Sequence, residues 1–387
     1  MNNRHMRAGA LIILLIVTVF NGVGRAQEAP GGSINISSAA AYVIDEQTGL
    51  ALLAKAADAP RPVASTTKIM TALLVLEEVR IDQTVTISAR AAGVSGATIG
   101  LKAGETRKVG ELLHALMLAS ANDAAVALAE KVAGSETAFV DMMNARAREL
   151  GAKNTRFVNP HGLAPGSAHY STAADLALMA RAAMARPDFR RLVSTRRYAW
   201  ETTETPKPRM LTNSNHLLET YPLATGVKTG YTAESGYCLV ASADKGKRSA
   251  IAVVLGGPSR EVSLDDARRL LDWTLNDFEY KAIVKRANRY GVITKRGKSV
   301  PVVAGRTLTA LVYDGEDGPV ELRSLMRPGI KLPIIKGEKL GKLTVVQLGK
   351  KIGAVDLVAG RSVSSPYVTD NLGDYFWRVV KKLENLF

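Results

Sequence analysis

The spacing of apolar residues changes along this 387-residue chain, and each spacing predicts a type of element. Apolar runs at Ala41–Asp45 and Leu50–Leu53, separated by a polar turn, predict a β-hairpin. Gly236–Ala243 and Ser249–Gly256 predict a second antiparallel pair, because only a short polar turn separates them. Helical spacing of apolar residues predicts helices over residues 65–76, 109–119, 124–132, 136–150, 171–185 and 261–278. The mixture predicts an α+β domain, an antiparallel sheet flanked by helices, over residues 27–280.

The pattern changes after Lys281. Short Val- and Leu-rich runs recur between Gly and Pro turns, and their spacing is typical of a small all-β module. The runs occupy residues 300–303, 308–312, 320–325, 342–346 and 355–358. We therefore expect a smaller all-β domain over residues 281–366, followed by a tail over residues 367–387.

The N-terminus predicts export. Arg4 and Arg7 precede an apolar run over residues 8–20, and the small-x-small tripeptide Gly24–Arg25–Ala26 follows. This order is that of a secretory signal peptide, and the apolar run is short for a membrane span. We expect residues 1–26 to be removed by cleavage after Ala26; an uncleaved membrane anchor is the alternative.

The tail has the pattern of an amphipathic helix from Tyr375 onwards. Such a helix either packs on its own domain or lies on a membrane surface. Aromatic residues beside lysines at the end of an exported chain favour the membrane. We therefore expect peripheral anchoring to the anionic surface of the inner membrane, on its periplasmic side. The apolar face would carry Tyr375, Phe376, Val379, Val380, Leu383 and Phe387, with Arg378, Lys381, Lys382 and Glu384 off it.

The amino-acid composition limits the kinds of partner and cofactor that we expect this chain to bind. The formal net charge of +15 indicates an anionic partner, either nucleic acid or an anionic membrane or envelope polymer. No basic run is interleaved with aromatic residues and no nucleic-acid motif occurs, so we do not expect nucleic-acid binding. The single cysteine, Cys238, allows no internal disulfide and lies in an apolar run, which predicts burial. His161 and His169 lack a carboxylate or cysteine at ligand spacing, and no phosphate-binding glycine loop occurs, so we expect no metal or other cofactor.

Ser65 and Lys68 form the first candidate catalytic pair. Ser65 stands at the predicted start of a helix, where unpaired N–H groups and the helix dipole favour developing negative charge. Lys68 lies one turn later, so its amine can reach the serine hydroxyl. A serine needs a base to become a nucleophile, and a lysine with a lowered pKa can be that base. Alone, S-x-x-K is a common spacing that equally describes a helix start with an exposed lysine.

Two further short motifs follow in order. Ser120–Ala121–Asn122 falls in a break between two predicted helices, and Lys228–Thr229–Gly230 precedes the predicted strand at Gly236–Ala243. Alone, each also fits a capping loop or an ordinary turn. The ordered set corresponds to the S-x-x-K, S-D-N and K-T-G motifs of penicillin-interacting serine enzymes. Together with an export signal, the set predicts acyl transfer.

The residue types suit that chemistry, which needs a nucleophile, a proton route and groups that hold the substrate. Ser65 would attack a carbonyl carbon and Lys68 would accept its proton. Ser120 would relay a proton to the leaving amine, and Asn122 would hold the substrate backbone. Lys228 adds a second positive charge, which would lower the pKa of Lys68 and attract a substrate carboxylate.

The chain resembles the low-molecular-mass penicillin-binding proteins of class C, which act as D-alanyl-D-alanine carboxypeptidases. The resemblance covers residues 38–280 strongly and the β-rich region more weakly. It implies a β-lactamase- or transpeptidase-like fold, peptidoglycan stem peptides as substrates, β-lactam antibiotics as covalent inhibitors and a C-terminal amphipathic anchor. Beyond the three motifs it rests on the blocks Tyr42–Asp45, Arg61–Lys68, Leu116–Ala124, Asn159–Leu163 and Gly226–Ala243.

The resemblance also implies catalytic roles. Ser65 is then the acylated nucleophile and Lys68 the acylation base, with Ser120 and Asn122 as the second catalytic element. The backbone N–H groups of Ser65 and Tyr231 would form the oxyanion hole.

For substrate binding, the resemblance implies that Lys228 and Thr229 grip the terminal carboxylate and that Arg260 lies near it. Gly230 would let the substrate approach the strand edge closely. The family often has glycine in the middle of the second motif, where this chain has Ala121; both residues are small.

We therefore expect a serine D,D-carboxypeptidase that removes the terminal D-alanine from stem pentapeptides through an acyl-enzyme on Ser65. A D,D-endopeptidase that cuts peptidoglycan cross-links would carry the same motifs, but the β-rich domain and tail favour the carboxypeptidase. A class A β-lactamase would need a deacylating glutamate between the second and third motifs, and no region clearly supplies one. A non-catalytic peptidoglycan-binding protein is a further alternative, against which the intact Ser65 and Lys68 argue.

Overall fold

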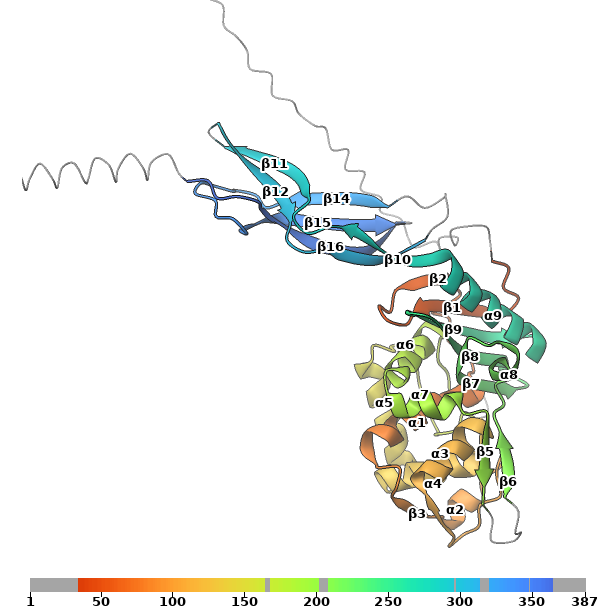
Figure 1. Ribbon diagram of the computed structural model, residues 1–387. Helices are drawn as coiled ribbons and strands as arrows, with labels where there is room; N and C mark the ends of the chain where they lie inside the picture. Colours follow the sequence, from red (N-terminus) through yellow and green to blue (C-terminus); the bar gives the residue numbers. More distant parts are fainter. Residues whose placement is uncertain are drawn as a thin grey trace, which may run out of the picture.

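The computed structural model describes residues 34–163, 168–201, 208–295, 297–313, 320–347 and 349–364. Its larger domain is built on a five-stranded antiparallel sheet of order β2-β1-β9-β8-β7 (Figure 1). Both predicted antiparallel pairs are confirmed, and β1 joins them by pairing with β9. The strands are β1 (Ala40–Asp45), β2 (Ala51–Lys55), β7 (Ala224–Thr232), β8 (Gly236–Lys245) and β9 (Arg248–Gly257).

Helices cover both faces of this sheet. Successive strand residues point to opposite faces, so Leu239 packs against Leu270 of α9 (Arg260–Asp277) whereas Val240 packs into a larger helical layer. The helical layer and the sheet enclose the main apolar core, and the nucleophile motif lies at its edge. The layer comprises α1 (Lys68–Glu78), α3 (Val109–Leu118), α4 (Asn122–Ala133), α5 (Glu136–Glu149), α6 (Ala173–Met184) and α7 (Pro187–Ser194).

Shorter elements connect these layers. A 3-10 helix, η1 (Ala64–Thr67), leads into α1. The remaining elements are the pair β3 (Thr84–Thr86) and β4 (Thr106–Lys108), the pair β5 (Arg197–Trp200) and β6 (Arg209–Thr212), and the one-turn helices α2 (Ala89–Ala92) and α8 (Leu217–Thr220).

Some helix boundaries differ from the prediction. The helix expected from residue 171 begins at Ala173, because Thr172 caps it by accepting the N–H of Asp175 at 3.0 Å. The helix expected from residue 124 begins at Asn122. The helix that begins at Ala173 ends before Pro187 as predicted. Pro187 then opens α7, because proline suits the first turn of a helix.

Residues 278–364 form a second, all-β domain, as the sequence predicts. A five-stranded sheet has the order β11-β12-β16-β15-β14, and β10 pairs with β13. Val302, Leu343 and Leu357 lie in its separate apolar core. The strands β10 and β11 were not predicted, and β10 starts ahead of the boundary expected at residue 281. The strands are β10 (Phe278–Val284), β11 (Arg289–Lys295), β12 (Lys298–Ala304), β13 (Leu308–Tyr313), β14 (Glu321–Met326), β15 (Lys339–Gln347) and β16 (Lys350–Ala359).

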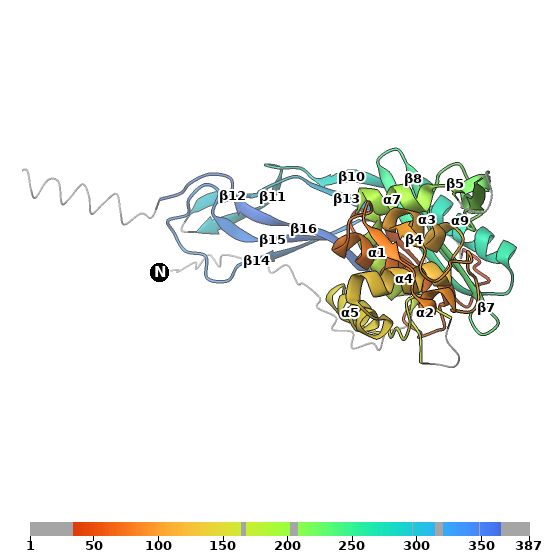
Figure 2. The same ribbon diagram turned by 90° about the horizontal axis from the view of Figure 1, so that it is seen from below.

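The two domains meet at a buried joint. Helix α9 passes directly into β10, and the ring of Phe278 packs edge-on against Trp273 and tilted against Tyr313, with centroids 4.9 and 5.3 Å apart. Tyr280 adds a hydrogen bond from its hydroxyl to Asp45 Oδ2 at 2.8 Å. From this joint the β domain projects lengthwise away from the larger domain (Figures 1 and 2).

The signal peptide expected at residues 1–26 and the amphipathic tail expected at residues 367–387 lie outside the described residues. Within the described ranges, no helix is both long and apolar enough to cross a membrane.

Candidate active site

Ser65 lies in the first turn of η1, immediately before α1. Ala64 has a φ of 46°, so the chain bends sharply just ahead of the serine. The Ser65 side chain is half-buried and borders a cavity. Lys68 Nζ lies 2.9 Å from Ser65 Oγ, so the structure brings the predicted pair into direct contact.

Lys68 is fully buried, and its amine is held in one orientation. Nζ donates to Asn122 Oδ1 and to the carbonyl oxygen of His161, at 2.8 Å each. Both acceptors lack a hydrogen to return, so in a neutral amine the lone pair is left facing Ser65 Oγ. This is the orientation that a general base for Ser65 requires.

The electrostatics favour the neutral amine. Burial, and then the charge of Lys228, hold the pKa of Lys68 well below its usual range, while the Asp123 carboxylate opposes them. Lys228 is itself 1% exposed, and burial lowers its pKa to about 7.

The second motif occupies the break between α3 and α4. Ser120 has a φ of 60°, a conformation that costs a non-glycine residue about 1–3 kcal/mol, and it borders the cavity. Asn122 begins α4, and its amide is used at both ends: Oδ1 accepts from Lys68, and Nδ2 donates to the Ser95 carbonyl at 2.8 Å. The structure therefore places Asn122 against Lys68, and not in the cavity wall that the substrate-binding prediction implied.

The third motif lies inside strand β7, next to the nucleophile. A Cβ on Gly230 would lie 2.9 Å from the backbone nitrogen of Ser65, so only glycine fits there without displacing backbone. Thr229 Oγ1 is 2.8 Å from Ser214 Oγ, which forms a pair of hydroxyls at the cavity. Lys228 Nζ donates to the Thr229 carbonyl at 3.0 Å.

These segments enclose a cavity of about 240 Å³. Tyr231 is 57% exposed at its rim, where its ring packs tilted against Tyr237 with centroids 4.4 Å apart. The predicted residues Lys68, Asn122 and Lys228 are buried and are not among the described residues that line it. The predicted residues that line it are Ser65, Ser120, Thr229, Gly230, Tyr231 and Arg260.

Two family models match the chain. One, described as D-alanyl-D-alanine carboxypeptidase, matches residues 24–259, and the other, the C-terminal domain of penicillin-binding protein 5, matches residues 278–365. The chain belongs to the D-alanyl-D-alanine carboxypeptidase family. It is a penicillin-binding serine D-Ala-D-Ala carboxypeptidase, as the resemblance of its motifs implies.

Relatives in this family align over most of the chain. The carboxypeptidase DacF of Bacillus subtilis is 37% identical over 329 residues, which is 82% of this chain and 84% of that protein. DacC of Escherichia coli is 30% identical over 396 residues, covering 97% and 94%. Among solved structures, DacD of Francisella tularensis superposes with a TM-score of 0.75 at 28% identity over 90% of this chain and 99% of that chain. Penicillin-binding protein 5 of Haemophilus influenzae gives 0.69 at 27% identity over 87% and 100%.

Several residues at this carboxypeptidase site carry no recognisable motif. Ser214, His216 and Leu264 line the cavity. Asp123 accepts backbone N–H groups from residues 99 to 101 at 3.0–3.1 Å, which fixes the loop that brings Ala97 to the cavity. Asp123 directly follows the second motif, and this position is the one feature of the sequence that could have indicated its role at the site.

The turn after Asn159 packs behind Ser65 and Lys68. His161 supplies the carbonyl that holds Lys68. Gly162 has a φ of 87°, and a Cβ there would lie 1.9 Å from the Ala64 carbonyl oxygen, so this turn packs directly under η1.

His169 ties the same region together through a chain of hydrogen bonds. Its Nδ1 accepts the Val158 N–H at 3.2 Å, so Nε2 carries the proton and donates to Thr67 Oγ1 at 2.8 Å. Burial, with the charge of Lys68 second, lowers the pKa of His161 to about 3 and of His169 to about 4, so both rings are neutral around pH 7. The two histidines therefore serve here as neutral hydrogen-bonding groups. Cys238 is 2% exposed, which confirms its predicted burial.

Proposed function

We propose that Ser65 attacks the carbonyl carbon of the penultimate D-alanine in a stem pentapeptide. Its hydroxyl proton passes to Lys68 Nζ as the Oγ–C bond forms. The negative charge that develops on the substrate oxygen is then stabilised by the backbone N–H groups of Ser65 and Tyr231. The close packing of Gly230 on the Ser65 backbone supports this pairing, because it brings the start of the Tyr231 peptide unit to the same wall.

When the tetrahedral intermediate collapses, the C–N bond breaks and terminal D-alanine leaves. Its amine takes the proton from Lys68 through the Ser120 hydroxyl, which borders the same cavity. Water then hydrolyses the Ser65 ester, with Lys68 again accepting the proton. A β-lactam would acylate the same oxygen, but its leaving nitrogen stays attached to the bound product.

The terminal carboxylate of the substrate is bound in the same proposal by Thr229 and Arg260. The hydroxyl pair of Thr229 and Ser214 supports this placement, and so does the position of Arg260 at the start of α9 on the cavity wall. Lys228 contributes through its charge from behind the wall. Asn122 acts by holding Lys68.

A single observation carries the assignment: the buried amine of Lys68 lies 2.9 Å from Ser65 Oγ, with its other hydrogens committed to Asn122 and His161. Labelling with a fluorescent penicillin tests it. Wild type should label, and Ser65→Ala and Lys68→Ala should not near neutral pH. The matched controls Ser194→Ala and Lys131→Ala, both in helices away from the cavity, should label normally. Appreciable labelling of Lys68→Ala would reject its role as the base.

Substrate choice is tested with purified pentapeptide and cross-linked muropeptides. We expect release of D-alanine from the pentapeptide to dominate; faster cleavage of cross-links would instead identify a D,D-endopeptidase. Rapid turnover of nitrocefin, in place of a long-lived acyl-enzyme, would identify a β-lactamase.

The proposal places the enzyme on the periplasmic side of the inner membrane, held by residues 367–387. The sequence pattern of that tail and the signal peptide predicted at residues 1–26 support this location. Deleting residues 375–387 should release the protein from membranes while D-alanine release continues. Retention on membranes after the deletion would refute the assignment of the anchor.

A further inference from the structure

The positive charge of this chain is concentrated in the β domain. Residues 278–364 contain 17 Lys and Arg against 7 Asp and Glu, out of 51 and 36 in the whole chain. The carboxypeptidase chemistry does not use this charge, because the proposed site lies in the other domain. A strongly basic domain beside the active domain points to an anionic surface as its partner.

The end of the β domain presents an exposed aliphatic residue on a rigid turn. We call residues 327–338, between β14 and β15, the tip loop. Ile330 and Ile334 anchor it in the core of the domain, whereas Ile335 is 66% exposed. The Glu338 N–H donates to the Ile335 carbonyl at 2.9 Å and closes the turn. The exposed side chain is therefore held outward by the packing of its neighbours.

Basic side chains flank Ile335. Lys331 and Lys336 are exposed, and within the described residues neither lies within ion-pair distance of a carboxylate. Glu338, the acid of the tip loop, is bound by Arg327 at 2.8 Å. Arg361 is also exposed beside the loop, where the neighbouring Ser362 hydroxyl accepts the Lys336 N–H at 2.9 Å.

The tip loop lies at the end of the β domain remote from the peptidase domain (Figures 1 and 2). Strand β15 spans the β domain: Gln347 contacts Tyr313 at the joint, and Lys339 at the other end follows the tip loop. Ile334 exchanges two backbone hydrogen bonds with Val363, at 2.9 and 2.8 Å. The described chain therefore ends, at residue 364, beside this loop, and the remaining 23 residues continue from there.

We propose that the tip loop is a membrane contact of its own. Ile335 inserts into the interface of an anionic bilayer while Lys331 and Lys336 face the lipid phosphates. Two observations favour an anionic membrane as the partner of this loop. The loop is basic, and the described chain ends beside it, where the predicted membrane-binding tail begins. A basic residue near an anionic surface contributes about 1 kcal/mol, and an inserted aliphatic side chain adds to this. The contact fixes the end of the β domain at the membrane, independently of whether the tail binds as a helix.

The test labels the full chain at the tip. In Ile335→Cys, an environment-sensitive dye should shift to shorter wavelength on addition of phosphatidylglycerol-containing vesicles and less with phosphatidylcholine alone. The native Cys238 is buried and does not compete for the dye. The matched control is Leu322→Cys, an exposed leucine on β14 that pairs with Val345 in the body of the sheet; its dye should not shift.

A second variant measures the contribution to binding. Lys331→Glu with Lys336→Glu in the full chain should weaken partition to these vesicles by about tenfold or more. The same charge change at Lys131 and Lys153, exposed on the peptidase domain, should not. An unshifted dye at position 335, or a shift produced by an anionic wall polymer but not by vesicles, would overturn the proposal. Penicillin labelling of each variant reports separately on the carboxypeptidase site.

Discussion

At the scale of single residues, the proposed site depends on two buried lysines that lie behind the cavity wall. Burying a charged amine is costly, and a second positive charge nearby raises that cost. Lys68 carries the larger penalty, because Lys228 acts on it in addition to burial. Around neutral pH, Lys228 is therefore protonated more readily than Lys68, and Lys68 remains the free base beside Ser65.

This division predicts the effect of Lys228→Gln on pH dependence. Removing the positive charge removes one cause that lowers the pKa of Lys68, so that pKa rises and less neutral amine is present at a given pH. The acidic limb of the acylation rate should therefore move to higher pH. Stopped-flow acylation by a fluorescent penicillin across the neutral range measures it. The control is Lys131→Gln, exposed on α4, which should leave the acidic limb unmoved. An unmoved limb in Lys228→Gln would show that the charge of Lys228 does not affect the pKa of Lys68.

The close approach of β7 to the nucleophile predicts the effect of Gly230→Ala. The added Cβ would lie 2.9 Å from Ser65 N and 3.0 Å from the Val63 carbonyl, and these backbone atoms cannot rotate away. Displacing the serine by about 1 Å should lower the acylation rate about 100-fold. Gly291→Ala on β11, where the added Cβ would lie 4.0 Å from Val302 Cβ, should acylate normally. Near-normal acylation of Gly230→Ala would show that the contact of Gly230 with the Ser65 backbone does not position the oxyanion hole.

At the scale of secondary-structure elements, the spacing of apolar residues predicted the helices and strands whose two faces differ in burial. The hairpin β1–β2 and the helices of the main layer were found in this way. Strand β7 was not predicted, because Gly226 and Gly230 remove the side chains that signal a strand, and the second of these glycines is required by the site. Strand β11 was missed because most of its residues are exposed on both faces.

The three motifs located the proposed reacting groups, but not the groups that hold them in place. The carbonyl of His161 and the loop fixed by Asp123 act through backbone groups, which any residue carries. Their roles depend on which distant segments pack together, and short-range pattern does not reveal that. Asn122 shows the same limit: its residue type was recognised, but its contact with Lys68 became visible only in the folded chain.

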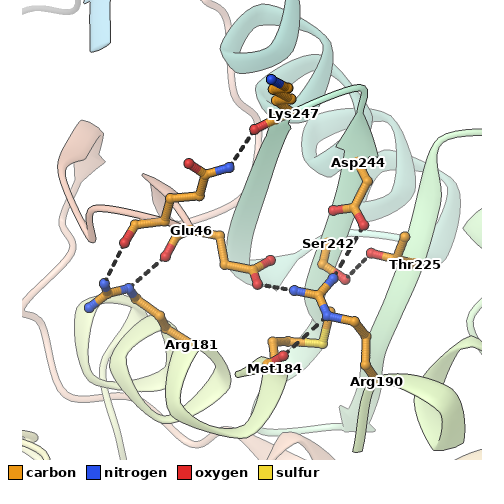
Figure 3. Close-up of polar contacts among 9 residues, drawn as sticks. Glu46, Arg181, Met184, Arg190, Thr225, Ser242, Asp244 and Lys247 are labelled. Carbon is orange, nitrogen blue, oxygen red and sulfur yellow. Dashed lines mark hydrogen bonds and ion pairs between the residues drawn. The ribbon is translucent and has the colours of Figure 1, made fainter. Parts of the chain in front are cut away.

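A charged cluster ties several elements together at the end of the sheet remote from Gly230 (Figure 3). Arg190 of α7 binds Glu46 in the β1–β2 turn and Asp244 at the end of β8, the latter at 3.2 Å. Arg181 of α6 donates to the carbonyl oxygens of Glu46 and Gln47 at 2.7 and 2.8 Å. Burial is the main cause that raises the pKa of Glu46, and the charge of Arg190 lowers it. Arg190 therefore stabilises the charged form of the buried Glu46 carboxylate, and it also pairs with the partly exposed Asp244.

Arg190→Met should consequently destabilise the fold by about 2 kcal/mol, because Glu46 and Asp244 lose their shared cation. Without Arg190 the pKa of Glu46 rises further. A raised pKa gives stability that is present at low pH and lost as pH rises, so the deficit should shrink as pH falls toward the ordinary range of a glutamate. Urea unfolding at several pH values measures this. Arg191→Met, on the exposed side of α7, is the control. A deficit that grows on acidification would contradict the assignment to Glu46.

At the scale of the whole molecule, the joint decides whether the two domains behave as one body. Phe278 is 3% exposed and belongs to the core cluster that contains Trp273 of α9 and Tyr313 of β13. The larger domain and the β domain thus share buried apolar surface, and the Tyr280 bond to Asp45 adds a polar restraint. Rigid coupling would hold the active site at a fixed orientation above the tip loop.

We therefore expect wild type to unfold in a single calorimetric transition and Phe278→Ala to unfold in two. Truncating a buried phenylalanine costs about 3–5 kcal/mol, and here that cost falls on the contact between domains. Penicillin labelling should persist in the folded variant, since Ser65 and the cavity lie away from the joint. Tyr280→Phe removes one hydrogen bond and keeps the ring, so it should lower stability by about 1 kcal/mol without splitting the transition. Two transitions already in wild type would mean that the domains are stable independently, and the orientation of the active site would then have to be set by the membrane contacts and not by the joint.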